Sequence, residues 1–303
     1  MKLSVVVTIV EGGAALDRCL AALGAQIEPP ELEVILPYDA SVPLDVVSRA
    51  SRFTWVRALP LGPVTTDHPI GSHAAQHELF DRRRAAGLKA ATGEVIAILE
   101  DRGAPRGDWA RNAVRLHEAL PHAVIGGAIE HVPTTPAAWA VYLCDFGRYQ
   151  LPFESRVAEW VSDVNVTYKR RALERTAALW SSRYHENRVH SALLALGETL
   201  YLSSELIVDH RRDVPNERAL LDERFHWGRL FGSTRVRDSS TLQRIGYIAL
   251  SGALPIVLLS RLAKHARRSG VPVTRFLRAS PRITGFLTAW VAGEVVGYVT
   301  RKA

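Results

Sequence analysis

The sequence has few features of a secreted, disulfide-rich or signal-bearing protein. Its 303 residues include only two cysteines, Cys19 and Cys144, which lie in apolar contexts without the spacing of a metal site. This scarcity favours a reducing, cytoplasmic setting. The first apolar run, residues 5–10, is too short for a signal peptide and ends at Glu11 without a small-residue cleavage site. We therefore expect that run to be the first strand.

Signals for nucleic-acid binding are also missing. The chain has no RNA-type aromatic motif, no zinc-finger spacing and no long run of Lys or Arg. Its net charge of +7 is nevertheless uneven, because residues 235–303 carry twelve Lys or Arg against Asp238 and Glu294, about +10, which leaves about −3 for the rest. A basic tail on a mildly acidic body predicts an anionic membrane surface as partner, and no nucleic acid.

Low-complexity linkers and internal repeats are absent, and what remains is a pattern of alternating elements. Apolar, β-branched runs alternate with stretches of helical spacing over the first hundred residues. The strands are expected at residues 4–10, 31–36, 54–59, 95–99, 123–129, 163–168 and 199–208. The pattern predicts an α/β fold with a mostly parallel central sheet flanked by helices. The aromatic stretch 133–152 is expected to be irregular.

The strand at residues 95–99 ends in two carboxylates, Glu100 and Asp101. In open α/β sheets, ligands bind beyond the carboxyl ends of the strands. Paired carboxylates at that edge are suited to a divalent cation with a bound phosphate. A solvated acidic turn is the competing interpretation of these two residues alone.

Three further stretches resemble the family 2 nucleotide-sugar glycosyltransferases. They are the opening strand 4–11, the strand and turn 33–41, which keeps Asp39, and the segment 84–94, which begins at Arg84 and ends in Ala-Thr-Gly-Glu. The resemblance covers roughly residues 3–235. It implies a GT-A type, Rossmann-like fold and an inverting transfer of a sugar, of the hexosyltransferase type.

The resemblance also implies a donor site. Asp39 would accept a hydrogen bond from the base, Thr8 and Glu11 would flank the base and ribose, and Arg84 would contact the nucleotide. The other implied contacts are Glu100 beside the diphosphate, and Asp101 and His210 as ligands of Mg²⁺ or Mn²⁺. The chain departs from the family at Arg102, a cation where a further carboxylate is usual. The sequence leaves open whether this change abolishes metal dependence.

On the acceptor side, Glu186 falls on the family position of the catalytic base, at the start of an expected helix 186–196. Inverting transfer needs one carboxylate to take the proton of the acceptor hydroxyl. A helix N-terminus lowers a carboxylate's pKa, so Glu186 is expected to be ionised near pH 7. Asp163 is the next candidate. The segment 224–231 resembles a mobile Gly-Arg segment, in which Arg229 would contact phosphate.

We expect two parts. Residues 1–235 form the catalytic domain, with a donor half to about residue 102 and an acceptor half from 103, and residues 236–303 form basic, amphipathic helices. The apolar stretches 245–260 and 286–299 fall short of the roughly 20 residues that cross a bilayer. We expect these helices to lie on the inner face of the cell membrane without crossing it. A helical hairpin packed on the enzyme or in a homodimer is the alternative, and both can hold together.

The leading hypothesis is a metal-assisted, membrane-associated cell-envelope glycosyltransferase with a nucleotide-sugar donor, which we expect to be a UDP-sugar, and a saccharide or lipid-linked acceptor. A non-catalytic nucleotide-binding module at the membrane is the alternative. A nucleotidyltransferase is a third, although residues 11–15 lack its Gly-rich loop with Arg and Lys. The sequence does not reveal the sugar, the acceptor or the oligomeric state.

Overall fold

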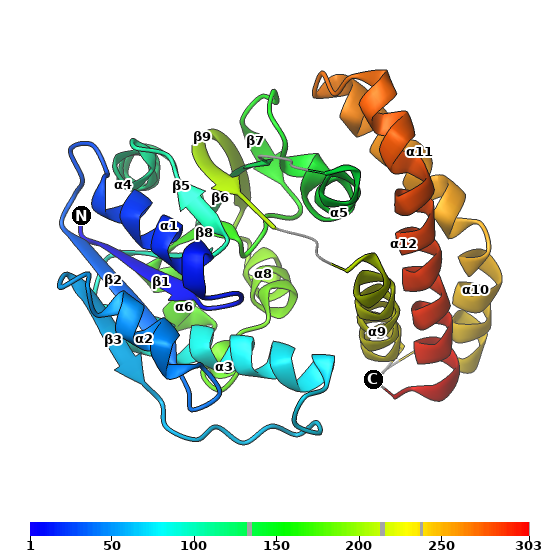
Figure 1. Cartoon of the computed structure of the whole chain (residues 1–303), viewed down its shortest axis with the longest axis horizontal. Coiled ribbons are helices and arrows are strands. Elements are labelled where there is room, and N and C mark those ends of the chain that lie inside the picture. The colour runs from blue at the N-terminus through cyan, green and yellow to red at the C-terminus, as the bar shows by residue number, and fades with distance from the viewer. Residues whose placement is uncertain (132–134, 213–215, 237–238, 303) are drawn as a thin grey trace. The chain divides into compact units, whose positions relative to one another are not determined.

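The computed structural model describes residues 1–131, 135–212, 216–236 and 239–302. The chain divides into two compact units, coloured along the chain in Figure 1. Unit 1 comprises Met1–Asp67, Ala75–Val132 and Phe153–Arg211. Unit 2 comprises His68–Ala74, Pro133–Pro152 and Arg212–Ala303.

Unit 1 is built on a nine-stranded sheet. Its strands are β1 (Leu3–Thr8), β2 (Leu32–Tyr38), β3 (Val56–Pro60), β4 (Val95–Glu100), β5 (Gly103–Pro105), β6 (Val124–His131), β7 (Arg156–Ala158), β8 (Asn165–Lys169) and β9 (Leu200–His210). The order is β3-β2-β1-β4-β8-β6-β9-β5, with β7 paired to β9. The first four are parallel, whereas β8 runs antiparallel to both β4 and β6. The predicted parallel order is confirmed in the first half, and the second half is mixed.

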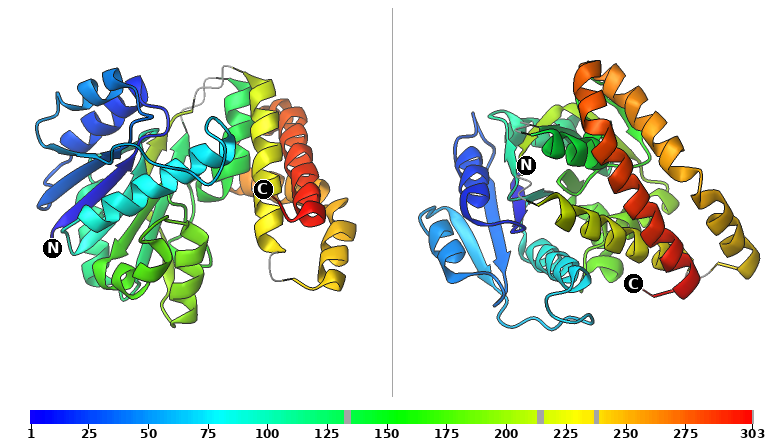
Figure 2. Two further views of the ribbon diagram at one scale, coloured as in Figure 1. Left: turned by 90° about the horizontal axis from the view of Figure 1, so that it is seen from below. Right: turned by 45° about the vertical axis from the view of Figure 1, so that its right-hand side comes forward.

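Helices cover both faces of this sheet, as Figure 2 shows. They are α1 (Gly13–Gly24), α2 (Leu44–Ala50), α3 (His73–Ala90), α4 (Trp109–Ala119), α6 (Arg170–Arg175), α7 (Ala177–Trp180) and α8 (Glu186–Ala195). Because side chains alternate along a strand, Val5 and Val7 enter a core with α1, α2 and α4. Val6 points the other way, where a Cβ on Gly87 of α3 would lie 2.3 Å from it. Helix α3 can approach the sheet this closely because residue 87 lacks a side chain.

The expected strands are present with ends shifted by a few residues, and the expected helices α1, α3, α4 and α8 are present too. Two three-residue strands, β5 and β7, are additions to the prediction. The expectation of an irregular stretch at 133–152 is wrong for its described part, residues 135–152, because α5 (Pro136–Phe146) and the 3₁₀ turn η1 (Gly147–Tyr149) lie there; residues 133 and 134 lie outside the described residues. Thr135 caps α5 by accepting the Ala138 N–H, and Pro136 occupies the first turn.

Unit 2 is helical. Besides α5 and η1 it contains α9 (Glu217–Arg235), α10 (Thr241–Ser251), α11 (Leu254–Arg268) and α12 (Val273–Thr300). Helices α9 and α12 cross at a pair of Gly-x-x-x-Gly motifs, formed by Gly228 and Gly232 on α9 and Gly293 and Gly297 on α12. A Cβ added to Gly228 would lie 1.9 Å from the backbone oxygen of Trp290. Small residues at this spacing let two helix backbones touch.

The outer surface of α10 to α12 carries apolar side chains. Their exposed residues include Leu242, Ile245, Leu250, Ile256, Val273, Leu277 and Val299. Among the described helices, α12 is the one that is long and apolar enough, by length and composition alone, to cross a membrane. Helices α10 and α11 meet these criteria only when they are counted together as one span, which would be bent by 62°. The expectation that the last apolar stretch is too short to cross a bilayer is wrong for the length of its helix. Helix α12 has 28 residues and begins well before residue 286.

The last boundary between the two compact units falls at residues 211 and 212, before the expected domain boundary at residue 235. Helix α9 belongs with the C-terminal helices, because the backbone of α12 packs directly against Gly228 and Gly232 of α9. The division at 235 between a catalytic domain and a membrane-associating tail stays a prediction about function.

Candidate functional site

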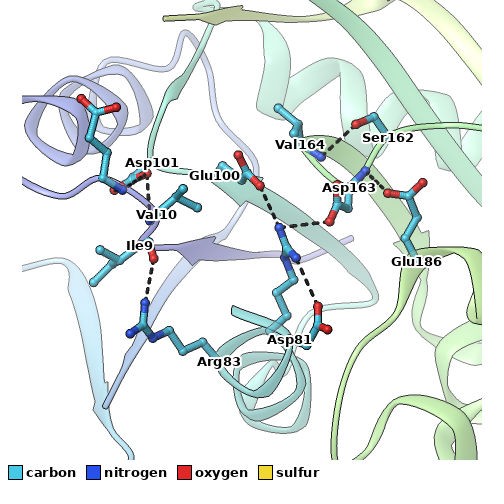
Figure 3. A network of polar contacts seen from close by, with 12 residues as sticks. Ile9, Val10, Asp81, Arg83, Glu100, Asp101, Ser162, Asp163, Val164 and Glu186 are labelled. Atoms are coloured by element: carbon cyan, nitrogen blue, oxygen red, sulfur yellow. Dashed lines mark hydrogen bonds and ion pairs between the residues drawn. The ribbon is translucent and has the colours of Figure 1, made fainter. Parts of the chain in front are cut away.

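The carboxyl ends of β1, β2 and β4 gather the first group of polar residues. Figure 3 shows Asp101 of this group beside Val10, and the second group around Glu100, Asp163 and Glu186. Asp101, directly after β4, is 1% exposed and binds the loop after β1. Its Oδ1 accepts the N–H groups of Val10 (3.1 Å) and Glu11 (3.3 Å), and its Oδ2 accepts those of Glu11 (3.1 Å) and Gly12 (2.6 Å). Burial raises the pKa of Asp101, while these three N–H donors act in the opposite direction.

Glycine makes this loop possible. Gly12 and Gly13 have φ values of 75° and 51°, in the left-handed region where a side chain is strained. These turns let successive amides point at one carboxylate, forming a backbone concavity that favours an anion. In this protein the anion is the Asp101 side chain itself.

Asp39, after β2, is 3% exposed and is held by an arginine of α3. Its Oδ2 accepts Nε of Arg83 at 2.6 Å, and its Oδ1 accepts the Ser41 N–H at 2.8 Å. Burial alone would raise the pKa of Asp39, but these hydrogen bonds outweigh it and hold the pKa below its usual value. Arg83 also donates to the backbone oxygen of Ile9 at 2.8 Å, so it ties β2 to the end of β1.

Arg83 was missed by the sequence interpretation, which selected the next residue. Three arginines occur in a row at 82–84, and successive side chains on a helix point about 100° apart. Adjacent arginines on α3 therefore reach different partners, Asp39 for Arg83 and Glu100 for Arg84. The register of the helix on the sheet, which decides between them, is set by Gly87 against β1.

Arg84 lies in a second group, on the side of β4 that faces β8. It is 5% exposed, and its Nη2 contacts Glu100 at 2.8 Å and Asp163 at 3.0 Å, while Nη1 contacts Asp81 at 3.5 Å. Three carboxylates thus share one guanidinium. Arg84 therefore links Glu100, at the end of β4, to Asp163, which precedes β8.

Glu186, the first residue of α8, completes this group. Its Oε2 accepts the backbone N–H of Asp163 at 2.9 Å. Burial raises the pKa of Glu186 well above its usual range, and the nearby Asp163 carboxylate acts in the same direction, outweighing Arg84. The expectation that the helix N-terminus keeps this pKa low is wrong, because desolvation and a like charge exceed the dipole effect. Burial also raises the pKa of Glu100.

A buried network of two tyrosines and a histidine connects α8 to β8. The hydroxyl of Tyr168 on β8 hydrogen-bonds to that of Tyr184, just before α8, and to Nε2 of His190 at 2.7 Å. All three side chains are buried. His190 lies four residues after Glu186, on the same face of α8. The network therefore anchors the turn of the helix that presents Glu186.

The remaining donor-side predictions lie on unit 1. Thr8 ends β1, is fully buried and pairs in register with Glu100. Glu11 is partly exposed, and its Oε2 accepts Nε of Arg102 at 3.0 Å. The structure thus brings Thr8, Glu11, Asp39 and Arg84 to one edge of the sheet, while their contact with a nucleotide stays a prediction.

The two expected metal ligands differ in their surroundings. His210 ends β9, is 2% exposed, and its backbone oxygen accepts Nδ1 of His131 at 3.1 Å. It pairs in register with Gly103, two residues beyond Asp101. Among the described residues no group of three His, Cys, Asp or Glu side chains could hold a metal ion together. The oxygens of Asp101 do not fit a cation either, because backbone N–H groups occupy them.

Arg229 belongs to unit 2. It lies on α9, and its Nε donates to the backbone oxygen of Lys302 at 3.1 Å, beyond the C-terminal end of α12. Its expected contact with phosphate stays a prediction.

No family model matches the chain, and no curated protein gives a significant sequence match. Solved structures do match. The chain is similar to S. aureus TarS at 13% identity and a TM-score of 0.50, over 95% of this chain and 55% of TarS. Structures of TarS 1–349, alone and in complex with UDP-GlcNAc, give 13% and 14% identity and TM-scores of 0.48 and 0.49, each over 97% of this chain and 90% of theirs. The chain spans about half the length of the longer TarS structure, and the likeness is one of fold.

Proposed function

We propose that the chain is an inverting glycosyltransferase of the hexosyltransferase type, which moves a sugar from a nucleotide donor to a saccharide or lipid-linked acceptor. The observation that carries this proposal is the group Arg84, Glu100, Asp163 and Glu186 beside the carboxyl edge of the sheet. The fold it shares with TarS agrees with this proposal. TarS has been solved with UDP-GlcNAc, so a UDP-sugar is the donor that we propose to test first.

Glu186 is the proposed general base. In the reaction, the acceptor hydroxyl oxygen bonds to the anomeric carbon, the bond from that carbon to the diphosphate breaks, and the hydroxyl proton passes to Glu186. A base acts best when its pKa lies near the working pH. The raised pKa of Glu186 makes it a stronger base than an ordinary glutamate, although it must lose its own proton first.

Arg84 and Asp163 are the proposed supports of that base. Asp163 fixes the Glu186 carboxylate through its backbone N–H, and Arg84 balances the negative charge that collects when both carboxylates ionise. On the donor side, Asp39 is the proposed partner of the base, in the orientation set by Arg83. Thr8, Glu11 and Glu100 complete the proposed donor pocket, and Arg229 is kept as a proposed phosphate contact.

The experiment measures release of nucleoside diphosphate from a panel of nucleotide sugars, with simple saccharides and lipid-linked saccharides as acceptors. We expect one donor to be turned over only when a suitable acceptor is present. Binding of a nucleotide sugar without turnover under any acceptor would favour the non-catalytic module. Release of pyrophosphate from a nucleoside triphosphate and a sugar phosphate would favour the nucleotidyltransferase.

The C-terminal helices are the proposed contact with an anionic membrane surface, at the cytoplasmic face. Exposed Leu and Ile side chains on α10 and α11 lie among basic residues, with Arg244 on α10 and Arg261 and Lys264 on α11. We propose that α12 does not cross the bilayer, because it packs on α9 and buries Glu294.

Flotation with liposomes tests this contact. The full chain should float with vesicles of anionic phospholipid and less with neutral vesicles, and a chain ending at residue 240 should stay in solution. A truncated chain that floats equally would contradict the proposal. Loss of a dimer, rather than of binding, on truncation would favour the homodimer alternative.

A further inference from the structure

The hydrogen bonds of Asp101 leave no place for the expected metal ion, so the diphosphate of the proposed donor needs another partner. Each carboxylate oxygen has two lone pairs in its plane. In Asp101 both oxygens accept two N–H groups, from Val10 and Glu11 on one side and from Glu11 and Gly12 on the other. A metal ion at Asp101 would have to break these bonds and open the loop after β1. Asp101 is thus already occupied as the anchor of that loop.

The second carboxylate of the pair is occupied as well. Oε1 of Glu100 contacts Nη2 of Arg84 at 2.8 Å, and Glu100 side-chain exposure is 15%. A cation beside Glu100 would meet the guanidinium that already neutralises it. Both carboxylates at the end of β4 therefore face donors of their own.

Arg102 is the next residue, and unlike the two carboxylates it keeps part of its hydrogen-bonding capacity unused within the described part of the chain. Its Nε is bound by Glu11, which leaves Nη1 and Nη2 without a hydrogen-bond partner among the described residues. Its backbone is fixed, because its carbonyl oxygen accepts the N–H of Arg211 at 3.0 Å. A side chain that is 19% exposed, with one edge of its fork held and the other open, can donate two parallel hydrogen bonds to phosphate oxygens.

We propose that the Arg102 guanidinium binds and neutralises the diphosphate of the donor, in the place of a metal ion held by Asp101. Glu11 serves as a positioning residue, since its hydrogen bond to Nε sets the plane of the fork. The proposal rests on the proposed function, because it takes a nucleoside diphosphate as the ligand. It predicts that donor binding is independent of Mg²⁺ and Mn²⁺.

Calorimetric titration of the full chain with nucleoside diphosphates tests this inference, using the tightest binder of a panel that includes UDP. In EDTA and in Mn²⁺ the Kd should agree within about twofold. Arg102→Gln should weaken the diphosphate by about 10- to 100-fold, the range for a lost charge-assisted hydrogen bond, and should leave the matching nucleoside unaffected. Arg102→Lys, which keeps the charge without the fork, should fall between.

The matched control is Arg106→Gln, which removes a nearby arginine that is paired with Asp209 and 44% exposed. Its diphosphate affinity should equal that of the unaltered chain. Loss of diphosphate affinity in EDTA, or an equal loss of nucleoside and diphosphate in Arg102→Gln, would overturn the inference and leave the proposed function standing. Failure of the unaltered chain to bind any nucleoside diphosphate would overturn both.

Discussion

The carboxylates at the end of the sheet form two regions that differ in their hydrogen-bond partners. In the first region, after β2 and β4, Asp39 and Asp101 each have hydrogen-bond donors on both oxygens. In the second region, around Arg84, the carboxylates of Asp81, Glu100 and Asp163 share one guanidinium, and Glu186 lies beside Asp163. Saturated carboxylates, with hydrogen-bond donors on both oxygens, hold the backbone in place, whereas in the crowded group burial raises the pKa of Glu100 and Glu186. The comparison separates the acidic residues that hold the backbone from the group that contains the proposed base, Glu186.

The largest expected effect comes from removing the proposed base. Glu186→Gln should lower turnover by about 10²–10⁴-fold, the usual worth of a general base. Donor affinity should be retained, because Asp39 and Arg102, the proposed donor contacts, do not belong to the group around Glu186. Initial rates and a donor titration on the same preparation measure the two quantities.

The same substitution should not destabilise the protein near pH 7. Because the folded state raises the pKa of Glu186, it disfavours the ionised form, and the neutral amide avoids that penalty. Glu174→Gln, at an exposed position on α6, is the matched control and should retain full turnover. Turnover of Glu186→Gln within about threefold of the unaltered chain would identify Asp163 as the next base to test.

Asp101→Ala should act on the fold. It leaves the N–H groups of Val10, Glu11 and Gly12 without their acceptor; the Gly12 hydrogen bond is buried and the others are partly buried. A buried group without its partner costs about 1–3 kcal/mol before the loop relaxes. We expect a loss of about 2–4 kcal/mol in the free energy of unfolding, measured with urea. The control is Asp45→Ala, an exposed residue in the first turn of α2, which should change stability by about 0.5 kcal/mol. Equal stability of the two variants would remove the distinction between saturated and crowded carboxylates.

Asp39→Ala should have the smallest of these effects. It should weaken binding of a uridine nucleotide by about 1–3 kcal/mol, since a hydrogen bond to a charged group is lost and Arg83 is left without its partner. Titration with uridine alone separates this effect from the diphosphate contact. Unchanged uridine affinity would place the base elsewhere on the sheet edge.

Much of the fold could be predicted because its signals are local. The apolar run of β4 and the glycine before it fix a strand within one residue of its observed end. The mixed second half is different, because the antiparallel placement of β8 between β4 and β6 depends on pairing between distant segments. Helix α5 had a local signal, a Thr cap followed by proline, that the interpretation passed over.

The sequence could place candidate residues at the ends of strands and helices, but it could not predict the contacts that they make. Glu186 was found at a helix start, yet its pKa depends on Asp163, which is 23 residues away in the chain. The choice between Arg83 and Arg84 depends on how α3 lies on the sheet. The occupied state of Asp101 depends on two glycines with positive φ, whose conformation the sequence alone does not specify.

The pH dependence of turnover tests the central claim most directly. With saturating donor, turnover should rise with pH through a limb above the ordinary pKa of a glutamate, because protonated Glu186 cannot accept the acceptor's proton. In Asp163→Asn the limb should move to lower pH, since one like charge is gone while burial remains. A limb that stays in place in this variant, or turnover that is independent of pH across that range, would contradict the account of Glu186 as a base raised by its neighbour.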